Sequence, residues 1–430
     1  MLPVQGLECR HIAIPGSCDP LGLPAHGIHR RFCHHAPFRF HGLRVGRALN
    51  GWNPYSSTIR ALGRQGKPLP FATITGWGKC MPPAVLTNAD LATFLDTDDE
   101  WIRSRTGINE RRVSHVSLGE MGYVAASRAL AAAGLKAADL DLIVFGTCSM
   151  DEQVPNMASW VQKRLGASGS GAMDVNTACT SFLYGMTTAS SMIKTGVVRN
   201  ALVIGGELAS PMLDWTNRNV SVLFGDGCAA VVLQAIEREE GVLADRLGCY
   251  GEVRGILQVH GMGSRYANKG WMLGDTDWVF DGQEIFKRAV VGMSRACEAV
   301  LSLRGLSPDD VHLVVPHQAN LRIIEAVVKR AGIPMERCYV NIQRYGNMSA
   351  ATVPVALVES LEDGRVAPGC NLLLTGFGAG LSWSAHVLRW GERIVPLEQS
   401  DVELPPCGKT ALEMVQGYIA AKRGSRLHGA

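Results

Sequence analysis

The sequence predicts an α/β fold in which two sheets alternate with three layers of helices, an α/β/α/β/α arrangement. An internal repeat is the main observation. Residues 129–147 (ALAAAGLKAADLDLIVFGT) align with residues 300–318 (VLSLRGLSPDDVHLVVPHQ) at a constant offset of 171. Residues 196–207 and 364–378 form a second matching pair at nearly the same offset. Because both pairs match in helix, turn and strand, we interpret the chain as a duplicated α/β unit.

The elements of each half follow in a fixed order. A helix is predicted over residues 119–135, where Gly134 supplies a C-terminal stop. Residues 139–149 (DLDLIVFGTCS) form a continuous apolar run, which is typical of a strand buried on both faces. A second helix is expected over residues 181–196, and a shorter alternating strand over residues 221–233. Two such sheets, with helices outside and between them, give the predicted layers.

Changes in composition divide the chain into four regions. Residues 69–240 and 241–393 are the two halves of the repeat, and residues 394–430 form a tail with a short amphipathic helix over 410–423. Residues 1–68 sum to a charge of +7, are broken by prolines and show no sustained period, so little packed structure is expected there. This composition is typical of a transit peptide, and equally of translated non-coding sequence. Its histidines (residues 32–41, FCHHAPFRFH) are interpreted as incidental rather than as a metal site.

The overall composition indicates a soluble globular protein. The chain has 430 residues, is 47% hydrophobic and carries a net charge of +3. No apolar run approaches the roughly 18 to 20 residues that span a bilayer, and no secretion signal is apparent. The twelve cysteines lack CxxC pairs and ligand spacing, which argues against disulfides and structural zinc. We therefore expect a cytoplasmic protein with no bound metal, no nucleic-acid partner and no membrane attachment.

The stretch DVNTACTSFLYG (residues 174–185) places Cys179 where a strand is expected to turn into a helix. Backbone N–H groups at a helix N-terminus favour a thiolate, so Cys179 is a candidate nucleophile. The alternative is one more buried cysteine. His317 follows a buried strand in the second half, and Asn347 precedes the helix that corresponds to the one after Cys179. The repeat therefore predicts that Cys179, His317 and Asn347 meet around a pseudo-twofold axis.

Four separated motifs carry a family resemblance. They are the Cys179 stretch together with VPHQANLRII (residues 315–324), YGNMSAATVP (residues 345–354) and GFGAGLSW (residues 376–383), and DEWIRSRTGINERR (residues 99–112) adds to them. In order and spacing they resemble the β-ketoacyl-acyl-carrier-protein synthase III family of the thiolase superfamily, from about residue 70 to residue 390. The resemblance implies a thiolase-like fold and a homodimer, with acyl-CoA and malonyl-acyl-carrier protein as substrates and no cofactor.

The resemblance also implies a two-step reaction that initiates fatty acid synthesis. An acyl group passes from acyl-CoA to Cys179, with an oxyanion hole formed by the backbone N–H groups of Cys179 and Ala379. Malonyl-acyl-carrier protein then loses CO₂, and His317 and Asn347 donate hydrogen bonds to the resulting enolate. No base is required, because decarboxylation itself generates the carbanion.

Further residues are assigned by the same resemblance. The CoA site is expected to use five side chains, for which surface or core roles are the alternative: Trp101, Arg105, Arg218, Gln283 and Asn320. Val154 is expected to line the acyl pocket across the dimer interface and, because valine is small, to admit primers longer than acetyl. Arg322 and Lys329 are expected to receive the acidic carrier protein, although a solvated helix face explains them nearly as well.

Related activities are weighed on the same residues. A thiolase needs a second cysteine in the glycine-rich loop, and residues 375–383 contain none. Chain-elongating synthases use two histidines where this chain has Asn347, and Glu152 is offset by two residues from the place of a general-base glutamate. An acyltransferase of secondary metabolism on the same fold remains an alternative, and a non-catalytic partner subunit is disfavoured by the intact cysteine and histidine. The primer, the carrier protein and the presence of residues 1–68 in the mature protein are not determined by the sequence.

Overall fold

The computed structural model describes residues 69–267 and 276–428. The predicted N-terminal extension, with its histidine-rich segment, lies outside this range. All described residues belong to one compact unit, so the two halves of the repeat pack as a single body. The first sheet ends at Ile236 and the second begins at Gly241, close to the predicted boundary between the halves.

The two sheets share one topology over four strands, as a duplication requires, and β5 adds an edge strand to the first. In each, two parallel strands are followed by two strands that pair antiparallel. The first sheet has the order β1-β7-β6-β4-β5 and the second has the order β8-β13-β12-β11. The strands of the first sheet are β1 (Phe71–Cys80), β7 (Gly227–Ile236), β6 (Asn200–Glu207), β4 (Leu142–Gly146) and β5 (Gly171–Val175). Those of the second are β8 (Gly241–Cys249), β13 (Ser382–Arg389), β12 (Asn371–Gly378) and β11 (Leu313–Pro316).

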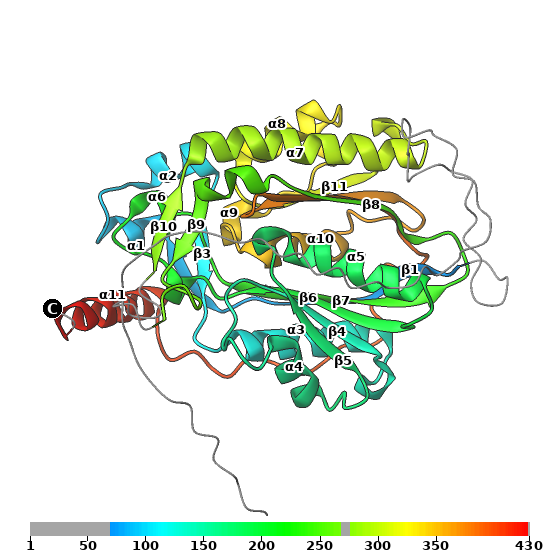
Figure 1. Cartoon of the computed structure of the whole chain (residues 1–430), viewed down its shortest axis with the longest axis horizontal. Helices are drawn as coiled ribbons and strands as arrows, with labels where there is room; N and C mark the ends of the chain where they lie inside the picture. The colour runs from blue at the N-terminus through cyan, green and yellow to red at the C-terminus, as the bar shows by residue number, and fades with distance from the viewer. Residues whose placement is uncertain (1–68, 268–275, 429–430) are drawn as a thin grey trace, which may run out of the picture. The chain divides into compact units, whose positions relative to one another are not determined.

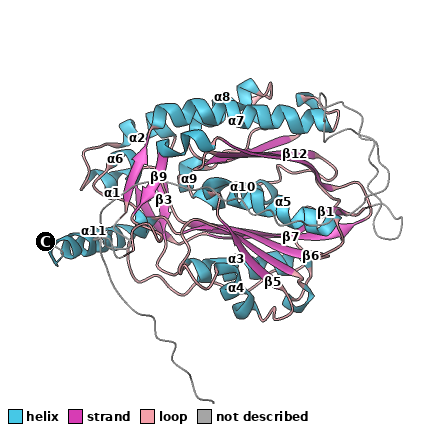
Figure 2. Cartoon of the chain, viewed as in Figure 1, coloured by secondary structure: helices cyan, strands magenta, loops and turns pink. Residues whose placement is uncertain are grey.

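Helices form three layers around these sheets, which confirms the predicted architecture (Figure 1, Figure 2). The outer face of the first sheet is covered by α3 (Leu118–Ala133) and α4 (Met157–Leu165). The outer face of the second is covered by α7 (Gly282–Leu303) and α8 (Leu321–Arg330). Between the sheets lie α5 (Ser181–Lys194) and α10 (Thr352–Glu362), which share the largest apolar core with both.

The central layer explains one difference from the sequence-based expectation. The alternating strand expected over residues 221–233 begins only at Gly227 and is buried at every position as far as Leu233. Helix α3 packs on one face of this strand and α10 on the other, so both faces need apolar side chains. The repeated helix and strand of the first half agree closely with prediction: α3 ends at Ala133, and Gly134 caps it with φ +66°.

Smaller elements surround one end of the sheets. They are β2 (Ala84–Thr87), β3 (Glu110–Val113), α1 (Asn88–Ala92), α2 (Asp99–Thr106), α6 (Arg218–Ser221), β9 (Leu257–His260), β10 (Asp277–Phe280) and α9 (Ile342–Tyr345). Two short hairpins, β2–β3 and β9–β10, stand apart from the main sheets. Within the part of the chain that the structure describes, no helix is long and apolar enough to cross a bilayer.

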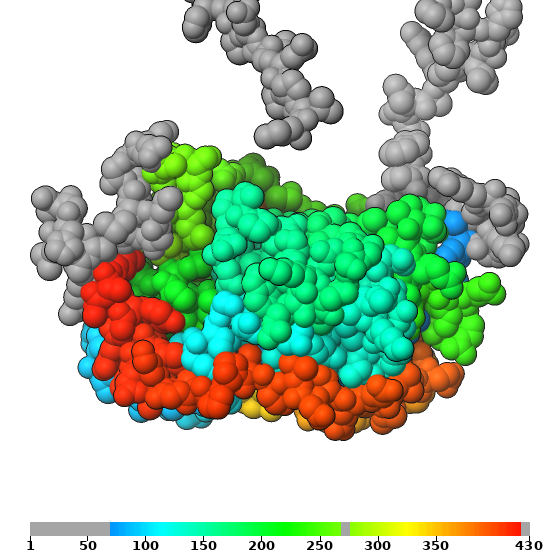
Figure 3. All heavy atoms as spheres, turned by 90° about the horizontal axis from the view of Figure 1, so that it is seen from below, coloured from blue at the N-terminus to red at the C-terminus, as the bar shows by residue number. Residues whose placement is uncertain are grey.

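The C-terminal tail packs on the body of the molecule. Figure 3 shows the segment after β13 in orange, passing along one face before the final helix in red. Leu397 N–H donates to Ala132 O (3.1 Å), which ties this segment to the end of α3. The helix α11 (Ala411–His428) covers the predicted range, and its buried Met414 and Val415 contact the core beside β2 and β3.

Candidate active site

One cavity brings the three predicted catalytic side chains together. Cys179, His317 and Asn347 all line a cavity of about 450 Å³ between the two halves. Cys179 lies in a single 3₁₀ turn (Ala178–Thr180) that leads into α5, and His317 directly follows β11. Asn347 precedes a second 3₁₀ turn that leads into α10. The ends of strands and helices from both halves therefore converge on this cavity.

The duplication extends to the conformation of the two turns. Ala178 and Ser349 are 171 positions apart, and both are non-glycine residues with positive φ, at +51° and +46°. Such conformations are strained and concentrate at functional sites. The same hydroxyl bond braces each turn: Ser181 Oγ donates to Ala178 O (2.6 Å), and Thr352 Oγ1 donates to Ser349 O (2.9 Å). One copy of the turn carries the thiol, and the other carries the amide.

The surroundings of Cys179 favour the thiol over the thiolate. Burial raises the pKa of Cys179 to about 12, a hydrogen bond with Ser349 lowers it, and the carboxylate of Glu207 raises it further. The expectation of a thiolate stabilised by the helix N-terminus stays a prediction, and burial acts on the pKa of Cys179 in the opposite direction. The effect of a helix dipole is modest and confined to the first turn, whereas removal from water disfavours the charged form of a thiol.

Alkylation of Cys179 by iodoacetamide is expected to accelerate about tenfold per pH unit between about pH 7 and 10. Only the thiolate reacts, and its fraction grows tenfold per unit below the pKa of about 12. The rate is followed through the mass of the Cys179 peptide, with the exposed Cys249 as the reference thiol in the same digest. A Cys179 rate that levels off below about pH 8 would contradict a pKa of about 12.

His317 is held as a neutral ring. Burial lowers the pKa of His317 to about 3, so the imidazole carries one hydrogen at neutral pH. His317 Nδ1 lies 2.5 Å from Thr352 Oγ1. The hydroxyl of Thr352 has a single hydrogen, which points either to this nitrogen or to Ser349 O. When the hydroxyl points to Ser349 O, the ring carries its hydrogen on Nδ1 and Nε2 accepts. When it points to the ring, Nε2 carries the hydrogen and donates.

Asn347 is fixed so that its donor end is left for a ligand. Its backbone pairs with the segment after α6, since Asn347 N–H donates to Leu223 O (2.8 Å) and Asn347 O accepts from Gly225 N–H (3.1 Å). The side-chain Oδ1 accepts from Ser349 N–H (2.8 Å). The amide Nδ2, with its two hydrogens, is therefore the end available in the cavity.

A second, smaller cavity begins at the same thiol. It has a volume of about 80 Å³, is lined by Cys179 and Ala379, and also contacts Glu207. The end of β12 approaches Cys179 so closely that a Cβ on Gly378 would lie 2.8 Å from Cys179 N. Ala379 therefore lines the same small cavity as the sulfur, and the oxyanion hole formed by its backbone N–H stays a prediction.

The buried carboxylate of Glu207 was missed by the sequence reasoning. Its Oε1 accepts from Thr147 Oγ1 (2.7 Å), Cys148 N–H (2.8 Å) and Ser149 Oγ (2.7 Å), and its Oε2 accepts from Ala350 N–H (3.2 Å). Three of these bonds lie within the first half, and the bond from Ala350 N–H links Glu207 to the second half. The sequence offered a signal for Ser349 and Thr352, since the 171 offset maps them on Ala178 and Ser181, but none for Glu207.

The predicted adenine residues form one cluster on the surface. The guanidinium carbon of Arg105 lies 4.6 Å from the ring centroid of Trp101, and that of Arg218 lies 5.0 Å from it. Arg218 also pairs with Asp96 (3.1 Å). Arg105 lines the 450 Å³ cavity, whereas Trp101 and Arg218 lie outside its lining. The cluster therefore stands at the edge of the cavity that leads to Cys179.

The other predicted binding residues are more dispersed. Asn320 lines the cavity, but its amide caps α8 through Arg322 N–H (2.9 Å) and donates to Arg105 O (2.9 Å), with no bond to His317. Gln283 is exposed at the start of α7 and does not line the cavity, which instead contacts its neighbour Gly282. Both residues stand at the starts of helices that line the cavity, and their contacts with CoA stay predictions.

Residues assigned to partner contacts lie on the surface. Val154 is 83% exposed and contacts neither cavity of its own subunit. Arg322 and Lys329 are exposed and two helical turns apart, so they share one face of α8, and Arg322 also donates to Ser104 O (2.7 Å). Glu152 is exposed as well and lines neither cavity with Cys179, so it has no place as a general base here.

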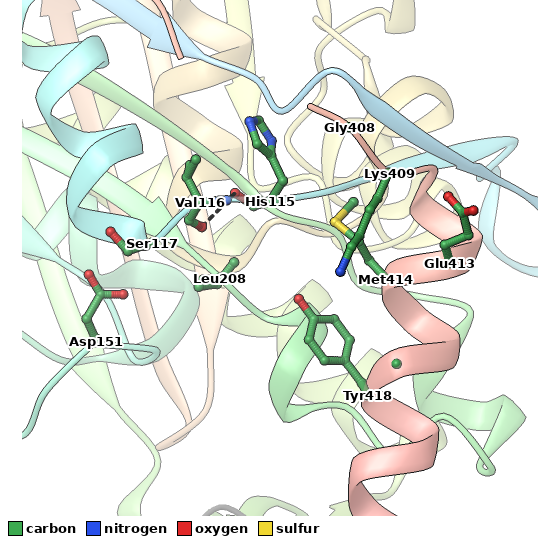
Figure 4. Close-up of a pocket in the computed structure, with 12 residues that line it drawn as sticks. His115, Val116, Ser117, Asp151, Leu208, Gly408, Lys409, Glu413, Met414 and Tyr418 are labelled. Atoms are coloured by element: carbon green, nitrogen blue, oxygen red, sulfur yellow. Dashed lines mark hydrogen bonds between the residues drawn. The ribbon is translucent and has the colours of Figure 1, made fainter. Parts of the chain in front are cut away.

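A metal centre and a larger cavity are the alternatives to this site. Within residues 69–267 and 276–428, no group of three or more His, Cys, Asp or Glu side chains is placed to hold a metal ion. The nine cysteines in that range are free thiols. A larger cavity of about 750 Å³ lies between α11 and residues 114–117 (Figure 4), but it lacks the nucleophile. The catalytic geometry is thus confined to the cavities at Cys179.

Comparisons with known proteins agree with this geometry. Residues 173–251 match the family model for 3-oxoacyl-[acyl-carrier-protein] synthase III, and residues 301–390 match the model for its C-terminal part. Beta-ketoacyl-[acyl-carrier-protein] synthase III 2 of Vibrio cholerae is 51% identical over 355 residues, covering 81% of this chain and 96% of the relative. The synthase III of Roseiflexus castenholzii is 45% identical, covering 74% and 98%.

Solved structures extend the same result. The crystal structure of the synthase III from Aquifex aeolicus is 41% identical, with a TM-score of 0.69, and covers 74% of this chain and 100% of the other. The priming β-ketosynthase of the R1128 polyketide pathway is 32% identical, with a TM-score of 0.72, covering 75% and 97%. The chain therefore belongs to the β-ketoacyl-acyl-carrier-protein synthase III family, as the motifs around Cys179, His317 and Asn347 predicted.

Proposed function

We propose that this condensing acyltransferase works in the cytoplasm through two half-reactions at Cys179, with acyl-CoA and malonyl-acyl-carrier protein as substrates and no cofactor. In the first, the thiol gives its proton to His317 Nε2 as sulfur attacks the thioester carbonyl. Backbone N–H groups of Cys179 and Ala379 hold the oxyanion. The carbon–sulfur bond to CoA then breaks, and CoA leaves as a thiol with the proton returned from His317.

In the second half-reaction, the malonyl carboxylate leaves as CO₂ and its bonding electrons enter an enolate. His317 Nε2–H and Asn347 Nδ2–H donate to the enolate oxygen, with Thr352 turned toward Nδ1 so that Nε2 carries the hydrogen. The carbanion attacks the acyl-cysteine carbonyl, and the bond to Cys179 breaks. The released thiolate takes a proton from water, and 3-oxoacyl-acyl-carrier protein departs.

The observation that carries this proposal is a buried, neutral histidine and a fixed amide donor that share one cavity with the thiol. A ring whose pKa is lowered to about 3 stays uncharged, so it suits donation to an enolate whose carbanion arises without a base. The carboxylate of Glu207 is fully engaged in hydrogen bonds to both halves, so it braces the site rather than removing a substrate proton.

The cluster of Trp101, Arg105 and Arg218 at the edge of the 450 Å³ cavity fits the CoA nucleotide, since its ring and guanidinium planes suit an adenine and phosphates. Gln283 and Asn320, at the starts of α7 and α8, fit contacts along the pantetheine arm. Arg322 and Lys329 offer two positive charges on one exposed helix face to an acidic carrier protein.

A homodimer fits the surface of the first sheet. Strand β5 is the last strand in its order, and its outer edge has no strand partner among the residues that the structure describes. Pairing with β5 of a second copy would satisfy that edge. The exposed Val154, which lies on the loop between β4 and α4, would then reach the partner's acyl pocket.

The test is an acylation series followed by condensation. The protein is incubated with acyl-CoAs of two to twelve carbons, and the mass of the Cys179 peptide is recorded before malonyl-acyl-carrier protein is added. Acylation followed by release of CO₂ and a 3-oxoacyl product is expected, with primers longer than acetyl preferred because Val154 is small. An acyl-cysteine that persists with malonyl-acyl-carrier protein, yet clears with an amine or alcohol, would assign an acyltransferase of secondary metabolism. A large preference for acetyl-CoA would overturn the primer length alone.

A further inference from the structure

We propose that the C-terminal helix α11 fixes one wall of the acyl pocket and thereby sets the longest primer that Cys179 accepts. The inference rests on the proposed function, in which the 80 Å³ cavity at Cys179 receives the acyl group. It assigns a role in specificity to the tail, residues 394–430, which lies outside the matched family models.

The wall in question consists of two segments joined at one carbonyl. Met212, at the end of a 3₁₀ turn (Ser210–Met212), and Trp278 of β10 both line the small cavity. Trp278 Nε1–H donates to Met212 O (3.0 Å), and the hydroxyl of Thr276 donates to the same oxygen. The ring of Phe224 lies 5.2 Å from that of Trp278. The positions of Met212 and Trp278 therefore depend on each other.

Helix α11 contacts both of these segments. Lys422 Nζ donates to Thr276 O (3.0 Å), two residues before Trp278. Tyr418 packs on the apolar core that also holds Leu213 and Trp215, and α11 contacts the turn Ser210–Met212. In Figure 4 the ring of Tyr418 points from α11 across the neighbouring cavity. The tail is thus hydrogen-bonded to the Trp278 side of the wall and packed against the Met212 side.

Apolar packing makes the attachment firm. Met414 and Val415 of α11 are buried in the same core as Leu213 and Trp215, which directly follow the Met212 turn. Trp215 Nε1–H in turn donates to Ser210 O (2.9 Å). Because these apolar side chains are buried against one another, the turn and the helix hold one another in place.

The size of the cavity makes the wall decisive for primer length. A volume of about 80 Å³ leaves room for only a short chain, whereas the cavity on the other side of the thiol is about 450 Å³. A longer chain therefore requires Met212 and Trp278 to move apart. Loosening their support from α11 lowers the cost of that movement for long primers and leaves short primers unaffected.

The experiment compares Tyr418→Phe/Lys422→Met with the matched control Lys409→Met, whose lysine precedes α11 and is exposed. Lys422→Met removes the hydrogen bond to Thr276 O, and Tyr418→Phe removes the hydroxyl of a ring packed beside the Met212 turn. Both substitutions keep the apolar part of the side chain. The rate of Cys179 acylation is measured by intact mass for each acyl-CoA from two to twelve carbons. We expect the ratio of decanoyl to butyryl rates to rise about tenfold in the double variant, the scale of one methylene group in an apolar pocket. The control should keep the original ratio.

The outcomes separate this inference from the proposed function. An unchanged ratio in the double variant, or an equal fall at all chain lengths, overturns the role of α11. Absence of acylation of the original protein by every acyl-CoA overturns the proposed function instead. Trp278→Leu acts on the wall directly and should raise the same ratio. If it does so while the double variant does not, the wall sets the length without the tail.

Discussion

Replacing Cys179 by serine is expected to reduce acyl transfer from acyl-CoA by at least about a thousandfold. The mutation keeps the shape of the turn and removes the sulfur, and a hydroxyl in the same buried site is far harder to deprotonate than the thiol, whose own pKa is already about 12. Intact mass after incubation with acyl-CoA measures the effect directly, since the original protein gains the mass of one acyl group and the variant gains none.

The matched control is Cys148→Ser. Cys148 lines the same small cavity, and its Sγ lies 3.9 Å from Ser349 Oγ, so it shares the surroundings of the nucleophile. In the Cys148→Ser variant, the rate of Cys179 acylation should stay within about threefold of the rate in the original protein. A change of this size is expected for a residue that does not take part in the reaction. Acyl groups found on Cys148, or acylation that survives in Cys179→Ser, would show that Cys179 is not the nucleophile.

Asn347→Asp is expected to slow condensation by about 10²–10³-fold and to leave acylation of Cys179 nearly unchanged. The aspartate keeps an oxygen that accepts from Ser349 N–H, so the turn is preserved. The second oxygen replaces the Nδ2 donor and, when ionised, sets a negative charge against the enolate. Losing one such donor corresponds to about 2.7–4 kcal/mol in the barrier. Single-turnover assays of each half-reaction separate the two effects.

The duplication provides the control for this variant. Asn176 lies 171 positions before Asn347, is exposed, and accepts from Ala178 N–H (3.3 Å) through the same kind of turn. Asn176→Asp should leave both half-reactions unchanged within about threefold, as for other surface substitutions. An equal loss in acylation and condensation for Asn347→Asp would mean that the amide supports the turn rather than the enolate.

The repeat made most of the fold and the three central residues predictable from sequence. A helix, turn and strand recurring at an offset of 171 imply two equivalent sheets, and equivalent strand ends must meet, so Cys179, His317 and Asn347 followed from position alone. The repeat does not show how far Cys179 is buried, and burial raises the pKa of its thiol. That burial depends on packing by distant segments such as the end of β12 at Gly378.

Residues that act through tertiary contacts could not be predicted from the sequence. Trp278 and Met212 are far apart along the chain and meet at one carbonyl oxygen, which no local pattern signals. Gln283 is exposed at the start of α7 and lies outside the cavity lining, so its contact with the substrate stays a prediction. Val154 stands outside both cavities of its own subunit, so its predicted role depends on a second copy of the chain.

The sharing of the active site between two copies of one turn has a consequence during protein synthesis. The turn with Cys179 leaves the ribosome first, and the turn with Asn347 follows only after β8 and β11, the first two strands of the second sheet. At about 5–20 residues per second, the interval between them is roughly 10 to 30 s. Throughout that time α5 lacks α10, its companion in the central layer, and the apolar face that both sheets share is exposed. The nascent first half is therefore the species most dependent on chaperones, and the thiol gains its partners only near the end of translation.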